Sequence, residues 1–280
     1  MLHERAMIAN VEICTWTARK HDKAVSQEVD KSHNAQDGGR YNKMLINKTA
    51  LDPITKHAGR IRAYHYSETL PWNDNGDRLL PAESYMDYMK EMRKFRHEME
   101  QLVDTFAANY NAEVTAARGR LGTMFDANDY PHVDHIKERF SIKTSFTPVP
   151  NSSDFRIDVP QEVMAEIKQE TDKQIASMTS TAIADCWSRI SKAVMRVYET
   201  MSKDKPIFRD SLIEDLEEVT TTIPRLNFTN NEALNKVVTD VKERLIKRPD
   251  SLRRSRSLRE SLRQISEEIL RDINTLQPTA

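Results

Sequence analysis

Two histidines and two nearby aspartates come closest to a metal-binding group in this sequence. His132 and His135 are three residues apart, so on a helix they would share one face, and Asp126 and Asp129 come just before them. The His-Glu-x-x-His spacing of helical zinc sites is absent. Polar residues at a loop-helix junction also serve capping and solvation. We therefore predict no metal and no cofactor, and keep a metal-dependent enzyme centred on His132 and His135 as a third alternative.

Motifs that bind phosphates or build a catalytic nucleophile are absent from the sequence. It contains no Gly-x-x-x-x-Gly-Lys-Ser/Thr, no Gly-x-Gly-x-x-Gly and no Gly-x-Ser-x-Gly. The two cysteines, Cys14 and Cys186, lie far apart, which argues against a disulfide framework and a cysteine zinc site. We identify no catalytic residue, and expect a protein that is not an enzyme.

Basic side chains are concentrated near the C-terminus. Residues 242–263 hold nine basic and three acidic side chains, although the net charge of the whole chain is −1. Clustered arginines can neutralise phosphates, so we identify a candidate nucleic-acid-binding face on the last helix. Its members are Arg253, Arg254, Arg256, Arg259 and Arg263. No aromatic residues lie between them, which favours the alternatives of a solvated face or a dock for the acidic residues at 210–218.

Three long helices are predicted from apolar residues that recur every three or four positions. They cover residues 82–118, 160–203 and 251–276. The spacing in the first and last is typical of the heptads of a coiled coil, and helices of this length need long partners. We predict that the first two pack antiparallel and that the seams contact a partner or another copy. The seam residues are Tyr88, Met92, Phe95, Met99, Leu102, Leu258, Leu262, Ile265 and Ile269.

A smaller amount of β-structure is predicted. The alternation at 10–17 indicates a strand, and a second strand is expected at 23–30. Asn75-Gly76 favours a tight turn. Two alternating runs on either side of Pro148 predict a β-hairpin at 139–159.

The predicted fold is mainly α with a small β component (α+β). It has long antiparallel helices with a β-hairpin, followed by a C-terminal helical bundle. We expect a small α+β region at 1–81, a long helical hairpin with its β insert at 82–205, and C-terminal helices at 206–280.

The sequence contains no run approaching the roughly 20 apolar residues of a membrane span. It also has no basic and then apolar start typical of a secretory signal. We expect no membrane partner and a cytoplasmic location, in a bacterium or a phage-infected cell.

The stretch from Leu70-Pro71-Trp72 through Asp77 to Pro81, together with Tyr85, Met89, Phe95 and Met99, resembles an uncharacterised family of bacteria, integrative elements and tailed phages. The later Phe155-Arg156-Ile157 belongs to the same resemblance, which covers residues 40–220. Members of such families are encoded near MoxR-type AAA+ ATPases. The resemblance implies a non-catalytic component of an ATPase-linked assembly and assigns no functional residue.

These observations favour a non-enzymatic structural or adaptor protein of phage or mobile-element origin. Its expected partners are itself, as a homo-oligomer, or another protein such as an AAA+ ATPase assembly. The alternative is a DNA-binding protein of phage recombination or replication that uses the C-terminal arginines.

Overall fold

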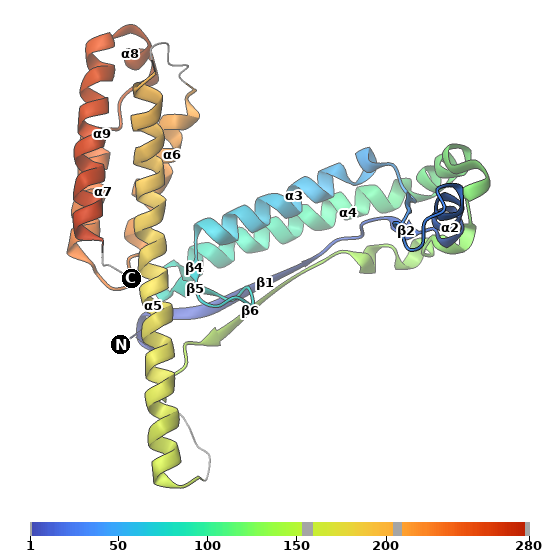
Figure 1. Ribbon diagram of the computed structural model, residues 1–280, viewed down its shortest axis with the longest axis horizontal. Coiled ribbons are helices and arrows are strands. Elements are labelled where there is room, and N and C mark those ends of the chain that lie inside the picture. The colour runs from blue at the N-terminus through green and yellow to red at the C-terminus, as the bar shows by residue number, and fades with distance from the viewer. Residues whose placement is uncertain (1, 153–158, 204–208, 278–280) are drawn as a thin grey trace. The chain divides into compact units, whose positions relative to one another are not determined.

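The protein is described by a computed structural model that covers residues 2–152, 159–203 and 209–277. The described chain is mainly α-helical with a small antiparallel sheet, which confirms the predicted mainly α class (Figure 1).

The chain forms two compact units. Unit 1 takes residues 1–10, 65–88 and 145–280, and unit 2 takes residues 11–64 and 89–144. Unit 1 therefore contains the whole C-terminal region 206–280, whereas 1–81 and 82–205 are each divided between the units.

Four helices build most of unit 1. They are α5 (Gln161–Met201), α6 (Ser211–Leu226), α7 (Glu232–Arg244) and α9 (Arg256–Leu276). Their apolar faces meet in one core, in which Trp187, Ile190, Leu216, Val241 and Ile273 are fully buried. Figure 1 shows α6, α7 and α9 around one half of α5. Unit 1 also contains the short helices α1 (Leu2–Arg5), η1 (Ala82–Ser84) and α8 (Pro249–Arg254).

The last predicted helix, 251–276, is interrupted. Ser255 has extended backbone angles (φ −116°, ψ 112°) and separates α8 from α9. Its side chain accepts a hydrogen bond from the Leu258 N–H at 3.2 Å, as an N-cap does. The prediction of one continuous helix is wrong at this point, because the serine satisfies a backbone donor that a continuous helix would have bonded internally.

The sheet has the strand order β4-β5-β1-β6. The strands are β1 (Ala6–Cys14), β4 (Leu70–Pro71), β5 (Arg78–Pro81) and β6 (Ser141–Pro148). β1 pairs antiparallel with β5, and β5 with β4. The turn between β4 and β5 contains Gly76 at φ +88°, which confirms the turn predicted at Asn75-Gly76.

The strand predicted at 10–17 begins earlier, since β1 starts at Ala6. The first arm of the hairpin predicted at 139–159 is β6, whereas most of its second arm lies outside the described residues.

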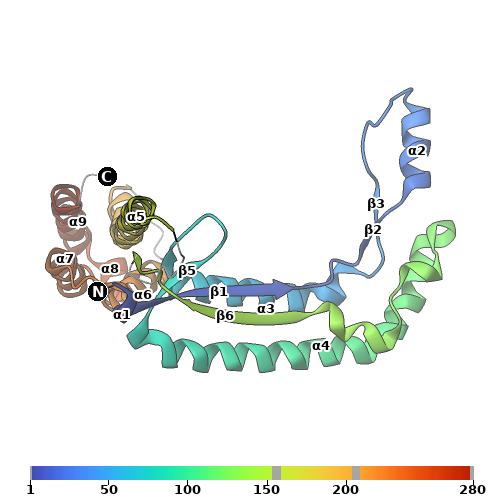
Figure 2. The same ribbon diagram turned by 90° about the horizontal axis from the view of Figure 1, so that it is seen from below.

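Unit 2 contains most of the helices α3 (Lys48–Ser67) and α4 (Tyr85–Leu121) and the short strands β2 (Arg19–His21) and β3 (Asn42–Met44). Helix α2 (Lys23–Ser32) follows β2 and precedes β3 in the sequence, as Figure 2 shows. Four short 3₁₀ segments complete the unit: η2 (Gly122–Met124), η3 (Ala127–Asp129), η4 (Val133–His135) and η5 (Lys137–Arg139).

The strand predicted at 23–30 is wrong, because α2 occupies these residues. Asp22 caps this helix, and its Oδ1 accepts from the Val25 N–H at 3.2 Å. Val25 and Val29 are four residues apart and so lie on one side of a helix.

Successive buried residues on α4 are four, three and four positions apart, and the same three spacings then repeat. The sequence runs Tyr88, Met92, Phe95, Met99, Val103, Phe106 and Tyr110. An 11-residue repeat of this kind follows a straight helix more closely than a heptad does. Val103 is therefore the buried residue, and Leu102, which the heptad reading selected, is only half-buried.

In unit 2 the α4 seam is covered by α3. The Phe95 ring lies 5.7 Å from the His57 ring and 5.4 Å from the Tyr64 ring, and His57 Nε2 lies 2.9 Å from the Phe95 carbonyl oxygen. The seam expected to pack against the helix at 160–203 is thus covered within its own unit.

Candidate functional site

The first half of α5 has no side chain buried by the part of unit 1 that the structure describes. Between Gln161 and Thr181 no side chain of this helix is buried, whereas eight are buried between Ala182 and Met201. Figure 1 shows the first half extending past the ends of α6, α7 and α9. We call residues 161–181 the exposed half of α5 and residues 182–201 its buried half.

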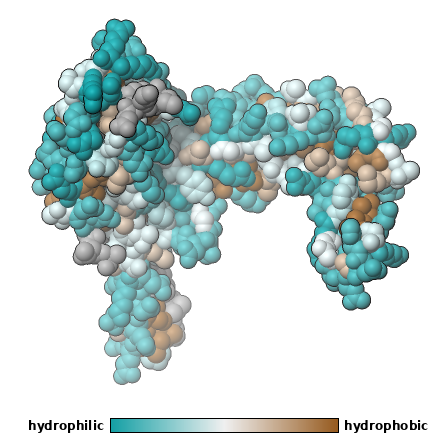
Figure 3. Space-filling view, turned by 45° about the horizontal axis from the view of Figure 1, so that its top comes forward, coloured by the Kyte–Doolittle hydropathy of each residue, from teal (hydrophilic) through white to brown (hydrophobic). Residues whose placement is uncertain are grey.

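Apolar side chains on the exposed half form one stripe. It consists of four half-buried apolar residues and one half-buried threonine: Met164, Ile167, Thr171, Ile175 and Met178. At about 100° per residue, these five positions fall within an arc of about 80°. Figure 3 shows apolar side chains gathered on one side of this protruding end. Ile175 and Met178 also pack against the unit 1 core, so the C-terminal end of the stripe meets this core.

Charged and amide side chains flank the stripe. Lys168 and Asp172 lie on one flank, and Glu170 and Gln174 on the other. Within the described part of the chain, none of the four forms an ion pair. This half of α5 therefore carries an apolar stripe with polar edges, the usual composition of a helix surface that packs against another helix.

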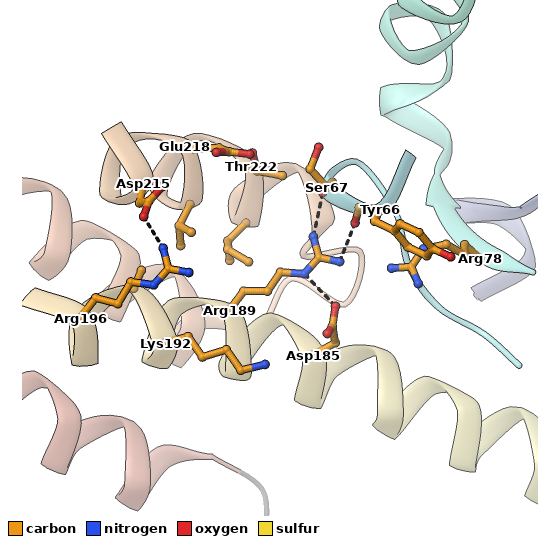
Figure 4. Close-up of a pocket in the computed structure, with 13 residues that line it drawn as sticks. Tyr66, Ser67, Arg78, Asp185, Arg189, Lys192, Arg196, Asp215, Glu218 and Thr222 are labelled. Carbon is orange, nitrogen blue, oxygen red and sulfur yellow. Dashed lines mark hydrogen bonds and ion pairs between the residues drawn. The ribbon is translucent and has the colours of Figure 1, made fainter. Parts of the chain in front are cut away.

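A second feature of unit 1 is a cleft of about 530 Å³ between α5, α6 and the segment that leads into β4. Figure 4 shows Arg189, Lys192 and Arg196 of α5 near its floor, with Asp215, Glu218 and Thr222 of α6 opposite.

Arg189 uses its guanidinium to join α5 to residues 66–69 of unit 1. Its Nε donates to Asp185 Oδ2 at 2.8 Å, and its terminal nitrogens donate to the carbonyl oxygens of Ser67 (2.7 Å), Tyr66 (2.9 Å) and Thr69 (2.6 Å). These carbonyls lie at and just beyond the C-terminus of α3, where backbone acceptors lack helical partners. A cation at this end also favours the helix dipole.

Arg78 extends this arrangement. Its guanidinium lies over the Tyr66 ring at 4.6 Å, and it donates to Thr69 Oγ1 and to the Thr69 carbonyl. Burial, together with the nearby charge of Arg189, lowers the pKa of Arg78 from its ordinary value. At the other end of the cleft, Arg196 pairs with Asp215. The three arginines of the cleft, with Asp185 and Asp215, are thus engaged by the chain itself, which is a structural role.

His65 lies buried nearby in unit 1. Its Nδ1 is 2.9 Å from the Tyr88 hydroxyl, and burial with a contribution from Arg78 lowers the pKa of His65 to about 4. The ring is therefore neutral at neutral pH and packs as a core residue.

The predicted arginine face is partly engaged by acidic neighbours. Arg253 pairs with Asp210 and Asp250, and Arg263 pairs with Glu260 and Glu267. The pair with Asp210 joins the basic and acidic stretches that the sequence suggested could dock.

Arg259 donates to the carbonyl oxygens of Leu252 and Arg253. Arg254 and Arg256 are exposed and form no hydrogen bond or ion pair with another described residue.

The predicted seam residues pack inside the chain's own units. Exposed fractions are 1% for Tyr88 and Met92, 6% for Phe95 and 4% for Met99. On α9, Leu262 and Ile269 are buried in the unit 1 core, and Leu258 and Ile265 are half-buried against it. These residues therefore contribute to intramolecular packing, and Leu102 is half-buried.

His132 and His135 each face a carboxylate close in sequence. His132 Nδ1 lies 3.2 Å from Asp134 Oδ2, and His135 Nδ1 lies 3.2 Å from Glu138 Oε1. Among the described residues, no three His, Cys, Asp or Glu side chains are grouped so that they could hold a metal ion.

Asp129, which we had grouped with these histidines, instead pairs with two lysines in unit 2. Its carboxylate contacts Lys20 and lies 2.7 Å from Lys43 Nζ. Burial acts to raise the pKa of Asp129, but the hydrogen bonds from Lys20 and Lys43 outweigh it and hold that pKa below its ordinary value. The sequence offered no signal for this network, because the lysines lie more than 80 residues away.

No helix in the described ranges is both long and apolar enough to cross a membrane.

Comparisons of the chain with models of protein families, with curated proteins and with solved structures found no match. The resemblance seen in residues 40–220 therefore stays a prediction. The function is inferred from two surfaces of unit 1, the apolar stripe on the exposed half of α5 and the arginines near the C-terminus.

Proposed function

We propose that the protein is a non-enzymatic structural or adaptor protein that assembles with a second copy of itself through the exposed half of α5. The observation that carries the proposal is the contrast within one helix of 41 residues. Its second half is covered by α6, α7 and α9, whereas its first half has no buried side chain and still carries an apolar stripe.

Apolar burial would drive this association. Covering half-exposed methionine and isoleucine side chains gains about 25 cal/mol for each Å² removed from water. A contact between two short helical segments is smaller than a standard interface of about 1,600 Å². We therefore expect weak association, with a dissociation constant in the micromolar range.

Light scattering coupled to size-exclusion chromatography tests the proposal. At high concentration the wild-type chain should approach twice its 32.4 kDa mass. Ile167→Glu, which places a charge in the stripe, should return it to a monomer. The matched control is Gln169→Glu, because this exposed residue adds the same charge on the opposite side of the helix. A wild-type chain that stays monomeric at high concentration would contradict the proposal.

The second candidate function is nucleic-acid binding at the C-terminal arginines. It is supported by the exposed guanidinium groups of Arg254 and Arg256. Changing both to alanine should weaken binding of a short DNA duplex and flatten its dependence on salt concentration. The matched control is Arg253→Ala, because Arg253 already pairs with Asp210 and Asp250. Equal DNA binding by wild type and the double variant would remove this candidate.

A further inference from the structure

We propose that the exposed half of α5 pairs antiparallel with the same segment of a second copy, about a two-fold axis that passes next to Thr171. The inference rests on the proposed function and deepens it, since it assigns the orientation and register of the contact.

The stripe is symmetric about Thr171. Ile167 and Ile175 lie four residues before and after it, and Met164 and Met178 lie seven before and after it. A contact between two identical surfaces requires that residue i meets residue j while j meets i. In an antiparallel pair centred on Thr171, methionine therefore meets methionine and isoleucine meets isoleucine across the axis.

The flanks of the stripe are complementary in the same register. Antiparallel pairing about Thr171 brings Lys168 of one copy to within about half a helical turn of Asp172 of the other, on the same side of the contact. Gln174 and Glu170 meet in the same way on the other flank. Each pairing occurs twice, so one arrangement would give Lys168 and Asp172 an ion pair, and Glu170 and Gln174 a hydrogen bond, that these side chains do not form within the described chain.

Thr171 itself is suited to the axis. Its hydroxyl donates to the Ile167 carbonyl oxygen at 2.8 Å, so the hydroxyl proton already has an acceptor within the helix. Burying this side chain against its copy therefore presents a methyl group without leaving a donor unsatisfied.

The surroundings of α5 in unit 1 favour the antiparallel orientation over the parallel one. Helices α6, α7 and α9 surround the buried half, which begins at Ala182, about 16 Å along the helix from Thr171. A parallel pair would bring these helices of both copies to the same end of the contact. An antiparallel pair places them at opposite ends, so only the exposed halves overlap.

Disulfide trapping of the full-length chain tests the register. All variants carry Cys14→Ser, because Cys14 is exposed, whereas Cys186 is buried. Thr171→Cys should form a disulfide-linked dimer on mild oxidation, because two cysteines facing each other across the axis can approach the Cα separation of about 4.4–6.8 Å that a disulfide needs. The matched control is Ala176→Cys, an exposed position on the far side of the helix, which should remain monomeric.

A mixture of two variants tests the orientation. Met164→Cys alone should not cross-link, because antiparallel pairing separates the two copies of this residue by about 21 Å. Mixed with Met178→Cys, it should form a heterodimer. A Met164→Cys chain that cross-links to itself would indicate a parallel pair and overturn the inference.

The remaining outcomes separate this inference from the proposed function. If light scattering shows a dimer that Ile167→Glu disrupts, but Thr171→Cys does not cross-link, the exposed half carries the contact and the register is wrong. If the wild-type chain stays monomeric at high concentration, both the proposed function and this inference fail.

Discussion

The two halves of α5 have similar apolar periodicity and different surroundings. In the buried half, Ile190 and Trp187 are fully buried among residues of α6, α7 and α9. In the exposed half, Ile167 belongs to the apolar stripe but is only half-buried. The comparison shows that an amphipathic pattern indicates which side of a helix can be buried. The neighbouring helices determine along what length of the helix that side is buried.

Cysteine chemistry should give the largest difference between the halves. Burial raises the pKa of the Cys186 thiol from 9.0 to about 12. Because only the thiolate reacts, a shift of this size lowers its fraction at pH 8 roughly a thousandfold. A cysteine placed at exposed Ala176 should react with iodoacetamide at an ordinary rate. Mass spectrometry of the alkylated Cys14→Ser chain measures both rates, and rapid labelling of Cys186 in the native chain would contradict the burial of this half.

The same substitution in both halves should have very different energetic effects. Ile190→Ala should lower the free energy of unfolding by about 2–5 kcal/mol, because it removes buried methyl groups and leaves a cavity. Ile167→Ala should change it by less than about 0.5 kcal/mol in a dilute, monomeric sample. Urea denaturation followed by circular dichroism measures both values. Equal losses would mean that the exposed half is covered within the chain.

Substitutions of polar residues should also affect stability differently in the two halves of α5. Arg189→Ala should lower the stability of unit 1 by about 1–3 kcal/mol, since it leaves Asp185 unpaired and three carbonyl oxygens without this donor. The matched change in the exposed half is Lys173→Ala, which should stay within about 0.5 kcal/mol. The readout is again the urea midpoint. An unchanged midpoint for Arg189→Ala would show that the hydrogen bonds of Arg189 contribute nothing to the stability of unit 1.

The smallest expected effect concerns the centre of the stripe. Thr171→Val keeps the shape of the side chain and replaces its hydroxyl with a methyl group. Antiparallel pairing next to Thr171 should then tighten by roughly threefold, because the buried surface becomes more apolar. Sedimentation equilibrium measures the dimerisation constant, and Thr181→Val, outside the stripe, is the control. A weaker dimer would argue that the threonine hydroxyl contacts the partner.

Local spacing predicted the long helices well. The uninterrupted run between Pro81 and Arg118 corresponds to α4, and four of the five seam residues predicted on it are buried. The heptad prediction was wrong at Leu102. Steps of three and four residues occur in both 7- and 11-residue repeats, so the spacing alone does not tell the two repeats apart. Only the packing of a straight helix against α3 distinguishes these repeats.

Predictions failed where one side chain outweighs the local pattern. Asp22 caps α2 in a segment whose composition suggested a strand, and Ser255 ends one helix and begins another within a continuous apolar stripe. In both cases a side-chain oxygen satisfies a backbone donor, which a periodicity argument does not include.

The polar clusters could not be predicted from the sequence. Arg189 bonds to carbonyl groups about 120 residues earlier in the chain, and Lys43 pairs with Asp129 more than 80 residues away in unit 2. Neither contact corresponds to a short-range pattern in the sequence, because both depend on where the helices and strands lie after folding.

Local spacing is enough to identify α5 as a long amphipathic helix on which Met164, Ile167, Thr171, Ile175 and Met178 recur symmetrically on one side. That burial begins at Ala182 follows only from the folded chain. The physical reason is that helical periodicity depends on residues three and four positions apart, whereas burial depends on α6, α7 and α9, which bury side chains fully only in the second half of the helix.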